Sequence, residues 1–277
     1  MTRMLALAAA VAVAVPVPAA RGQLIAYDGF AYPTGGVNAQ NGGTGFTGPW
    51  AAAATVQVQA GSLTPPAPSA GLPTTGNSVS ATAADPFSPG TATRTLSQPV
   101  DSTPGGTFWM SAVMKGSGAD ASTTEGELVL SDGAGGGVSV TTGTDSNNLW
   151  SLSDTSTGLF IASSTVPNTT QSLLVVRGTF AAAGDTFDLY VNPPLTGSPP
   201  PSAAASITTT HAAGPLGSLQ MSHFAFDTVS STLFDEVRIG RTFADVTAVP
   251  EPSALLLAGA AGVGGLTYRR ARRKSDR

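Results

Sequence analysis

Two glutamates in the segment 123–131 have the spacing of a paired-carboxylate site. Glu125 and Glu127 are separated by one residue, so both side chains lie on the same face if the segment is a β-strand. Two neighbouring carboxyl groups can supply the acid and the nucleophile or base of glycoside hydrolysis. A solvated pair on an edge strand is the simpler prediction, because nothing else in the segment separates the environments of the two groups.

The segment GTGFTG at residues 43–48 matches the letters of the dinucleotide-binding fingerprint. That fingerprint works only where a strand leads through a turn into the N-terminus of a helix. Here Pro49 and Trp50 follow, and then alanine-rich, β-like sequence. The sequence therefore predicts a surface loop from which Trp50 packs back onto the body.

Cysteine chemistry and histidine-rich metal sites are both excluded by composition. The chain has no cysteine, so it has no disulfides, no thiolate zinc site and no cysteine nucleophile. His211 and His223 are the two histidines, too few for a histidine-rich metal site. We expect both to be core or loop residues.

Asp28 in YDGF and Asp235 in FDEVRIG are candidate ligands of a structural calcium ion. They are predicted to lie in the first and last strands, which are neighbours in many jelly rolls. The Asp-x-Val-Arg pattern at 235–238 resembles the last strand of laminarinase-type sandwiches, and this resemblance implies that Asp235 helps to hold calcium, which needs several oxygen ligands. The alternative is that Asp235 or Glu236 pairs with Arg238 at the surface. Laminarinase-type enzymes also have a Glu-x-Asp-x-x-Glu order, whose third carboxylate is missing after Glu125.

Alternating sequence predicts strands throughout the segment that must position these residues. In GTFWMSAVMK (106–115), Phe108, Met110, Ala112 and Met114 fall on one face, and Trp109, Ser111 and Val113 fall on the other. The runs 172–180 and 185–193 are joined by Ala-Ala-Ala-Gly and predict a hairpin. Further strands are predicted in ELVLS, GVSVTT, LWSLS, LFIAS, ASITTT, LQMSHFAFD and LFDEVRIG.

The composition agrees with an all-β fold, a single antiparallel β-sandwich over residues 23–247. Only 11% of the residues are charged, and the chain contains 33 glycines and 21 prolines, which favours short strands and turns over long helices. Two proline-rich segments, 63–73 and 192–206, are predicted to be loops within this one domain.

Charge excludes nucleic acid as a partner of this body. Residues 23–249 contain five basic and fifteen acidic side chains, whereas phosphate binding needs a basic face. With three tryptophans and four tyrosines in the whole chain, few aromatic rings are available for stacking on sugars. Exposed Trp50, Trp109 or Trp150 on a concave sheet face would favour carbohydrate binding, and buried rings would favour a structural role.

The N-terminus has the order of a secretory signal peptide over residues 1–22. Arg3 precedes an apolar stretch from Met4 to Val15, and small residues follow. Cleavage after Gly22, with Ala20 at position −3, is the first expectation, and cleavage after residue 19 is the alternative. An uncleaved anchor helix is the competing interpretation of the same segment.

The C-terminal residues 248–277 have three parts. Pro250, Glu251 and Pro252 come first, and residues 253–268 then form an uncharged run of sixteen, which as a helix is about 24 Å long. This predicts a short transmembrane helix. Residues 269–277 form a basic tail, which the positive-inside rule places in the cytoplasm; its basic residues are Arg269, Arg270, Arg272, Arg273, Lys274 and Arg277.

This order resembles the PEP-CTERM sorting signal of bacterial envelope proteins. The resemblance implies recognition by a membrane-embedded exosortase, cleavage near Pro250-Glu251-Pro252, transient membrane anchoring, and delivery to the cell surface or extracellular matrix. A simple single-span anchor with a chance triplet is the alternative. The stretches 24–50, 173–193 and 234–252 also resemble LamG-like, concanavalin-type jelly-roll proteins with such tails, many from planctomycete-type bacteria, and imply two curved antiparallel sheets.

The sequence thus predicts an exported, surface-sorted β-sandwich with a structural or adhesive role and no catalysis. A carbohydrate-binding module for extracellular polysaccharide is the alternative from a different class. A degenerate glycoside hydrolase, built on Glu125 and Glu127, is the third hypothesis.

Overall fold

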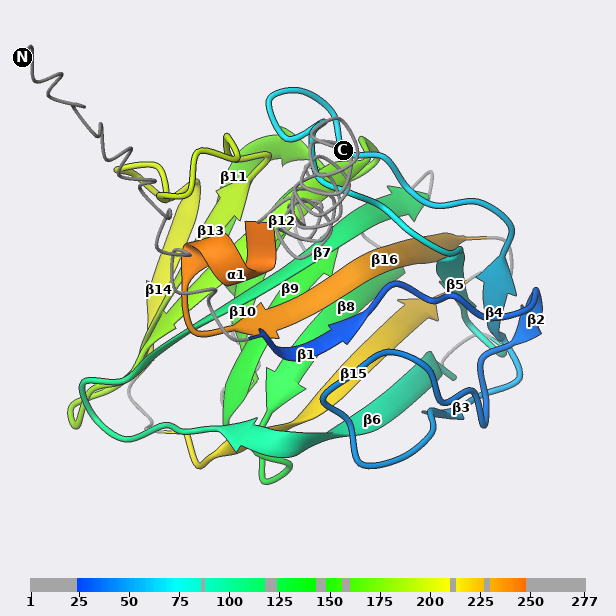
Figure 1. Ribbon diagram of the computed structural model, residues 1–277, viewed down its shortest axis with the longest axis horizontal. Helices are drawn as coiled ribbons and strands as arrows, with labels where there is room; N and C mark the ends of the chain where they lie inside the picture. Colours follow the sequence, from blue (N-terminus) through cyan, green and yellow to red (C-terminus); the bar gives the residue numbers. More distant parts are fainter. Residues whose placement is uncertain are drawn as a thin grey trace, which may run out of the picture.

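The computed structural model describes residues 24–85, 88–117, 124–142, 148–155, 160–209, 213–226 and 230–247, which form strands and one short helix (Figure 1). The elements are β1 (Leu24–Asp28), β2 (Gly35–Gly36), β3 (Ala51–Ala52), β4 (Val56–Gln59), β5 (Ser78–Thr82), β6 (Gly90–Val100), β7 (Thr107–Ser117), β8 (Thr124–Ser131), β9 (Gly137–Thr142), β10 (Leu149–Asp154), β11 (Phe160–Pro167), β12 (Ser172–Thr179), β13 (Thr186–Val191), β14 (Ala205–Thr208), β15 (Leu216–Ala225), β16 (Ser231–Gly240) and α1 (Phe243–Thr247).

The strands form two antiparallel sheets packed as a jelly-roll-like sandwich. The nine-stranded sheet has the order β14-β13-β12-β7-β16-β5-β4-β2, with β1 also paired to β16. The seven-stranded sheet has the order β11-β10-β9-β8-β15-β6-β3. The last strand, β16, therefore lies inside its sheet beside β1 and β7, as Figure 1 shows. The prediction of an all-β antiparallel sandwich is confirmed.

Strand β7 shows why the alternating sequence produces two layers of packing. Phe108, Met110 and Met114 point into the main core, where they meet side chains of the seven-stranded sheet such as Leu128. The intervening residue Trp109 belongs to a second cluster on the opposite face. This division is the one that the two-residue period predicts. Burying side chains of this size contributes about 1.5–3 kcal/mol each.

The second cluster covers the outer face of the nine-stranded sheet. Strand residues such as Trp109 meet Leu63 and Leu72 of the first proline-rich segment and Phe243 of α1. Ser69 Oγ of the first proline-rich segment donates a 2.6 Å hydrogen bond to the carbonyl of Pro193 in the second. No strand or helix lies in residues 63–73 or 192–204, so both segments are loops as predicted, except that Ala205 and Ser206 at the end of the second belong to β14. The first segment packs directly on the sheet.

The predicted hairpin of residues 172–193 is confirmed. Strands β12 and β13 pair antiparallel, from Leu174 opposite Val191 to Thr179 opposite Thr186. Between these ends, Arg177 and Asp188 face each other and form a 2.6 Å ion pair.

The predicted signal peptide (1–22), transmembrane helix (253–268) and basic tail (269–277) lie outside the described residues. Among the residues that the structure does describe, no helix is long and apolar enough to cross a membrane.

Candidate functional site

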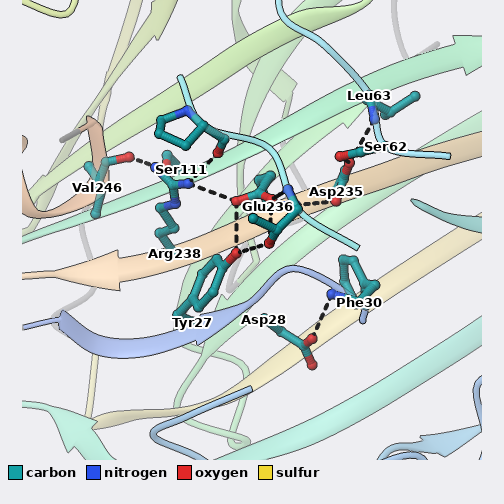
Figure 2. A network of polar contacts seen from close by, with 12 residues as sticks. Tyr27, Asp28, Phe30, Ser62, Leu63, Ser111, Asp235, Glu236, Arg238 and Val246 are labelled. Carbon is teal, nitrogen blue, oxygen red and sulfur yellow. Dashed lines mark hydrogen bonds and ion pairs between the residues drawn. The ribbon is translucent and has the colours of Figure 1, made fainter. Parts of the chain in front are cut away.

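The segment FDEVRIG forms a polar centre in strand β16 (Figure 2). Asp235 and Glu236 are fully buried, and Arg238 is 5% exposed. A β-bulge between Asp235 and Arg238 interrupts the pairing with β7, and Glu236 has a φ of 51°. A bulge re-aims side chains, so two consecutive acidic residues of this strand can both reach the loop that precedes β5.

Asp235 holds the beginning of that loop. Its Oδ2 accepts hydrogen bonds from the Ser62 hydroxyl and from the backbone N–H of Leu63, the latter at 2.7 Å. Its Oδ1 accepts the Glu236 N–H at 2.8 Å. Burial raises the pKa of Asp235 to about 7, although these hydrogen bonds oppose the shift.

Glu236 and Arg238 hold the end of the same loop. Glu236 Oε1 accepts hydrogen bonds from the backbone N–H and the hydroxyl of Thr75. Glu236 Oε2 accepts the Tyr27 hydroxyl at 3.1 Å and pairs with Arg238 at 2.7 Å. Arg238 also donates to the carbonyl of Pro73 at 2.8 Å. The pair predicted at the surface is thus Glu236 with Arg238, and it is buried.

Asp28 is the centre of a second buried cluster. Its Oδ2 accepts hydrogen bonds from Tyr32 Oη, from Trp50 Nε1 at 3.0 Å and from Arg94 at 2.8 Å. Its Oδ1 accepts the Phe30 N–H at 2.9 Å. Burial, together with the hydrogen bond to Asp28, raises the pKa of Tyr32 to about 12. The carboxylate of Asp28 therefore has an ion-pair partner in Arg94 and protein hydrogen-bond donors on both oxygens.

The contacts of Asp28 and Asp235 do not fit a calcium site. The two residues do lie in neighbouring strands as predicted, since β1 pairs with β16 and Asp28 lies opposite Val237. Each carboxylate accepts protein donors on both oxygens, and a cation would have to replace the Arg94 guanidinium at Asp28. Over the described residues, no group of three His, Cys, Asp or Glu residues could hold a metal ion. Calcium binding stays a prediction that the geometry does not favour.

Glu125 and Glu127 lie in β8, a central strand of the seven-stranded sheet. Leu128 and Leu130 of this strand point into the core, so the alternation puts both glutamates on the outer face. Glu127 accepts a hydrogen bond from the Ser222 hydroxyl at 3.1 Å. Burial raises the pKa of Glu125 to about 8, and the neighbouring Glu127 adds to the shift. The pair is therefore not on an edge strand, and Glu125 is only partly accessible to solvent.

Glu127 is part of a row of polar residues that runs across six strands of this outer face. Antiparallel register places one residue of each strand directly opposite the next, and Ser151 and Ser163 at the end of the row are 3.0 Å apart at their hydroxyl oxygens. The row, which we call the polar row, consists of Thr91, Ser222, Glu127, Thr141, Ser151 and Ser163. Apart from Glu127 it carries no charge.

The glycine-rich segment 43–48 is a loop against β1 and has no helix after it. Gly45 has a φ of +83°, and a Cβ there would lie 2.0 Å from the carbonyl oxygen of Ile25. Thr44 exchanges backbone hydrogen bonds with Tyr27, and Trp50 is 1% exposed. The prediction of a loop from which Trp50 packs back onto the body is confirmed. The glycines allow the loop to lie close to β1.

The other candidate residues are also part of the packing. His223 is buried in β15, with its Nδ1 3.0 Å from Thr232 Oγ1, and His211 lies outside the described residues. Trp50, Trp109 and Trp150 are all buried. The three indole rings therefore form no exposed platform for sugars.

Arg94 is the residue that sequence reasoning missed. It points into the core with Ala92 and Leu96, contacts the Phe46 ring with its guanidinium carbon 4.2 Å from the ring centroid, and pairs with Asp28. A signal was present, because alternation in TATRTLS puts Arg94 on the same face as Ala92 and Leu96. A buried arginine requires a carboxylate partner.

Comparison with solved structures identifies similar folds at low sequence identity. A structure reported with endo-acting O-glycanases of the human gut microbiota has a TM-score of 0.48 and 9% identity, covering 79% of this chain and 100% of that chain. An endo-1,3-beta-glucanase from Streptomyces sioyaensis has a TM-score of 0.46 and 10% identity, covering 82% and 98%. The carbohydrate-binding module CBM66 from Bacillus subtilis has a TM-score of 0.35 and 12% identity, covering 67% and 95%. These likenesses concern the fold alone.

The sequence comparisons identify the C-terminus and leave the body unassigned. No curated protein matches the chain. Residues 248–273 match the model of the PEP-CTERM protein-sorting motif. The match begins directly after α1, which ends at Thr247. The chain therefore carries a PEP-CTERM protein-sorting motif at its C-terminus, and this motif implies an exported protein that an exosortase sorts.

Proposed function

We propose that this protein is exported, processed by an exosortase and delivered to the cell surface or extracellular matrix, where the sandwich has a structural or adhesive role. The observation that carries the proposal is the sorting-motif match over residues 248–273, which starts where the last described element ends. Removal of the motif would therefore leave every described strand and α1 in place. A sorting motif that is removed by cleavage fits such a boundary.

The order of the C-terminal segment supports transient anchoring before processing. Pro250 and Pro252 disfavour a helix that extends backwards from the membrane, so the chain around Glu251 would be extended, as a protease substrate must be. The apolar run 253–268 then stops export, and the basic tail 269–277 is retained on the inner side by the positive-inside rule and by anionic headgroups. Processing would release the body outside the cell.

The polar contacts of the body support a role without catalysis. Asp28, Asp235 and Glu236 each accept hydrogen bonds that hold loops or neighbouring strands. Glu125 and Glu127 lack the third carboxylate of the laminarinase-type order. A LamG-like jelly roll whose acidic side chains are used in this way suits a stable surface component.

Mass spectrometry of the C-terminal peptide tests the sorting proposal. Protein from cells that contain an exosortase should end near Pro252, whereas protein from cells without one should retain the full tail in the inner membrane. Glu251→Ala should block processing, and Asp276→Ala, the matched removal of an acidic side chain in the tail, should not. An intact basic tail on surface-localised wild-type protein would show that the segment is an ordinary anchor.

A second candidate function, binding of extracellular polysaccharide, is supported by the polar row. Thr141, Ser151 and Ser222 of the row are buried, so the groups that a sugar could reach are those of the exposed Ser163 and the half-buried Thr91 and Glu127. Thr93 and Gln220, which are also half-buried, lie opposite each other beside the row. The buried tryptophans count against sugar stacking. A glycan array with the purified full-length protein tests this function: binding that is lost in Gln220→Ala and kept in the exposed-loop variant Ser198→Ala would support it, and no binding to any glycan would end it.

A further inference from the structure

Asn41 and Gly42, in the loop between β2 and β3, form the only Asn-Gly pair of the chain (Figure 1). In such a pair the backbone nitrogen of the glycine can attack the side-chain amide carbon of the asparagine, which closes a succinimide ring and expels ammonia. The missing Cβ of glycine leaves this approach unhindered. Asn41 is exposed and Gly42 is half-buried, so water can reach the ring that forms.

The side-chain amide of Asn41 is held by a fixed cation. Its Oδ1 accepts a hydrogen bond from Arg94 Nη2 at 2.8 Å. The guanidinium cannot turn away easily, because Arg94 Nε donates to the carbonyl of Gly48 at 2.7 Å and the guanidinium carbon lies 4.2 Å from the centroid of the Phe46 ring. Negative charge develops on the amide oxygen when a nucleophile attacks the amide carbon, and a donor already fixed at that oxygen lowers the barrier.

The backbone nitrogen of Gly42 faces a proton acceptor. The Gly42 N–H donates to Tyr32 Oη at 3.2 Å, and the Tyr32 hydroxyl donates to Asp28 Oδ2. The pKa of Tyr32 is raised to about 12 by burial and by the hydrogen bond to Asp28, so the phenol is protonated at neutral pH. Its oxygen can therefore accept one proton while its own proton passes to the carboxylate. Arg94 Nη1 is 3.3 Å from Tyr32 Oη, so Arg94 contacts both the amide oxygen and the acceptor of the Gly42 proton.

Packing keeps the Gly42 nitrogen and the phenol together. A Cβ at position 42 would lie 2.7 Å from Cε1 of the Tyr32 ring, so a larger residue there would displace the ring. Tyr32 is 6% exposed, and its ring contacts that of Phe30 edge to face, with the centroids 6.2 Å apart. The glycine and the buried ring thus hold the N–H against the hydroxyl oxygen.

We propose that Asn41 and Gly42 form a self-modifying site, at which the folded protein converts Asn41 to aspartate or isoaspartate. The Gly42 nitrogen bonds to Cγ of Asn41 while its proton passes to Tyr32 and the Tyr32 proton passes to Asp28. The bond between Cγ and the amide nitrogen then breaks, and this nitrogen leaves as ammonia with the returned proton. Water opens the succinimide at either carbonyl, so one water is consumed for each ammonia released.

The aspartate product would keep the cluster together and add a charge to it. Arg94 would then have a carboxylate at Nη2 as well as Asp28 at Nη1. Hydrogen bonds between ionised groups are stronger than those to a neutral amide. This inference does not depend on the proposed sorting function, because every group in it lies in the body.

Mass spectrometry of the purified full-length protein, incubated at neutral pH, tests the site. Conversion of Asn41 should be about tenfold or more faster in the folded protein than in concentrated urea, because positioned acid–base groups act only in the fold and typically contribute about 10²–10⁴-fold. Asn77 is the matched control in the same digest. Its Oδ1 accepts the Gly61 N–H at 2.9 Å, and the next residue, Ser78, is buried in β5, so folding should slow its conversion.

A pair of tyrosine variants identifies the proton acceptor. Tyr32→Phe keeps the ring and removes the hydroxyl, and should slow conversion of Asn41 in the folded protein about tenfold or more without changing the rate in urea. Tyr27→Phe is the matched control, because it removes a hydroxyl that donates to another carboxylate, that of Glu236, and it should leave the rate unchanged.

Two results would overturn the proposal. One is a rate at Asn41 in folded wild-type protein that does not exceed the rate in urea, and the other is folded Tyr32→Phe that converts as fast as Tyr27→Phe. The rate at Asn77 reports whether each variant is folded, since it rises to the value in urea when the protein unfolds. If Tyr32→Phe does not fold, the comparison of wild-type protein with and without urea decides.

Discussion

The buried ion pair of Arg94 and Asp28 makes a strong prediction about stability. The two side chains are 2% and 1% exposed and 2.8 Å apart. Arg94→Met keeps much of the side-chain volume and removes the charge. Asp28 would then be a buried carboxylate without a cation, and the Gly48 carbonyl, which accepts Arg94 Nε at 2.7 Å, would lose its donor.

The expected cost of this substitution is large. Removing one partner of a buried pair costs about 3–5 kcal/mol, because the remaining charge is left uncompensated. A domain of this size loses about 2–4 °C in Tm per kcal/mol, so the Tm should fall by roughly 6–20 °C. The matched control is Arg177→Met. Its ion pair with Asp188 is 2.6 Å long, and the Asp188 side chain is 10% exposed, but that of Arg177 is 40% exposed. The loss should therefore be smaller than for the fully buried pair, and nearer to the roughly 0–1 kcal/mol of exposed pairs.

Urea denaturation and calorimetry of both variants and of wild-type protein measure these differences. Asp28→Asn in the Arg94→Met background should recover part of the loss, because it removes the uncompensated charge. The reasoning is refuted if Arg94→Met destabilises the protein no more than Arg177→Met does.

Three further predictions concern pH, the first proline-rich segment and calcium. The pKa of Glu125 is raised from 4.5 to about 8 and that of Asp235 from 3.8 to about 7. Both groups bind protons more tightly in the folded protein than in the unfolded chain, so the free energy of unfolding, measured by urea titration, should fall as the pH rises from about 4 to about 8. Glu125→Gln should make this dependence on pH weaker. Glu236→Ala should release the end of the loop between β4 and β5, which contains the first proline-rich segment, and speed its cleavage by thermolysin. Thr196→Ala, in the second proline-rich segment, should not. Millimolar calcium should leave the Tm of wild-type protein unchanged, and an increase that Asp235→Ala abolishes would show that the predicted calcium site exists.

Local sequence was sufficient wherever the two-residue period decides the structure. It predicted the two faces of β7 and the hairpin of β12 and β13. The neighbouring positions of Asp28 and Asp235 were expected from the likeness to jelly rolls, and the pairing of β1 with β16 confirms them. Local sequence failed for the partners of polar groups. The bonds of Asp235 to Ser62 and of Glu236 to Thr75 join residues more than 160 positions apart, and no local pattern encodes such pairs.

The glutamate pair shows the same limit. Two-residue spacing placed Glu125 and Glu127 on one face correctly, but it suggested an edge strand, whereas β8 lies between β9 and β15. The raised pKa of Glu125 follows from that central position, because burial there disfavours the charged form.

The sequence by itself determined the class of fold and the C-terminal sorting motif, because side-chain alternation and the order of Pro-Glu-Pro, apolar run and basic tail are local properties of the chain. Only the tertiary structure decided what the acidic residues do. Burial requires each charged group to find hydrogen-bond partners of the protein. The packing of the two sheets placed Arg94 of β6 beside Asp28 of β1, and the loop between β4 and β5 brought the first proline-rich segment to β16. It also packed α1 against β7, where the Ser111 hydroxyl donates to the carbonyl of Val246.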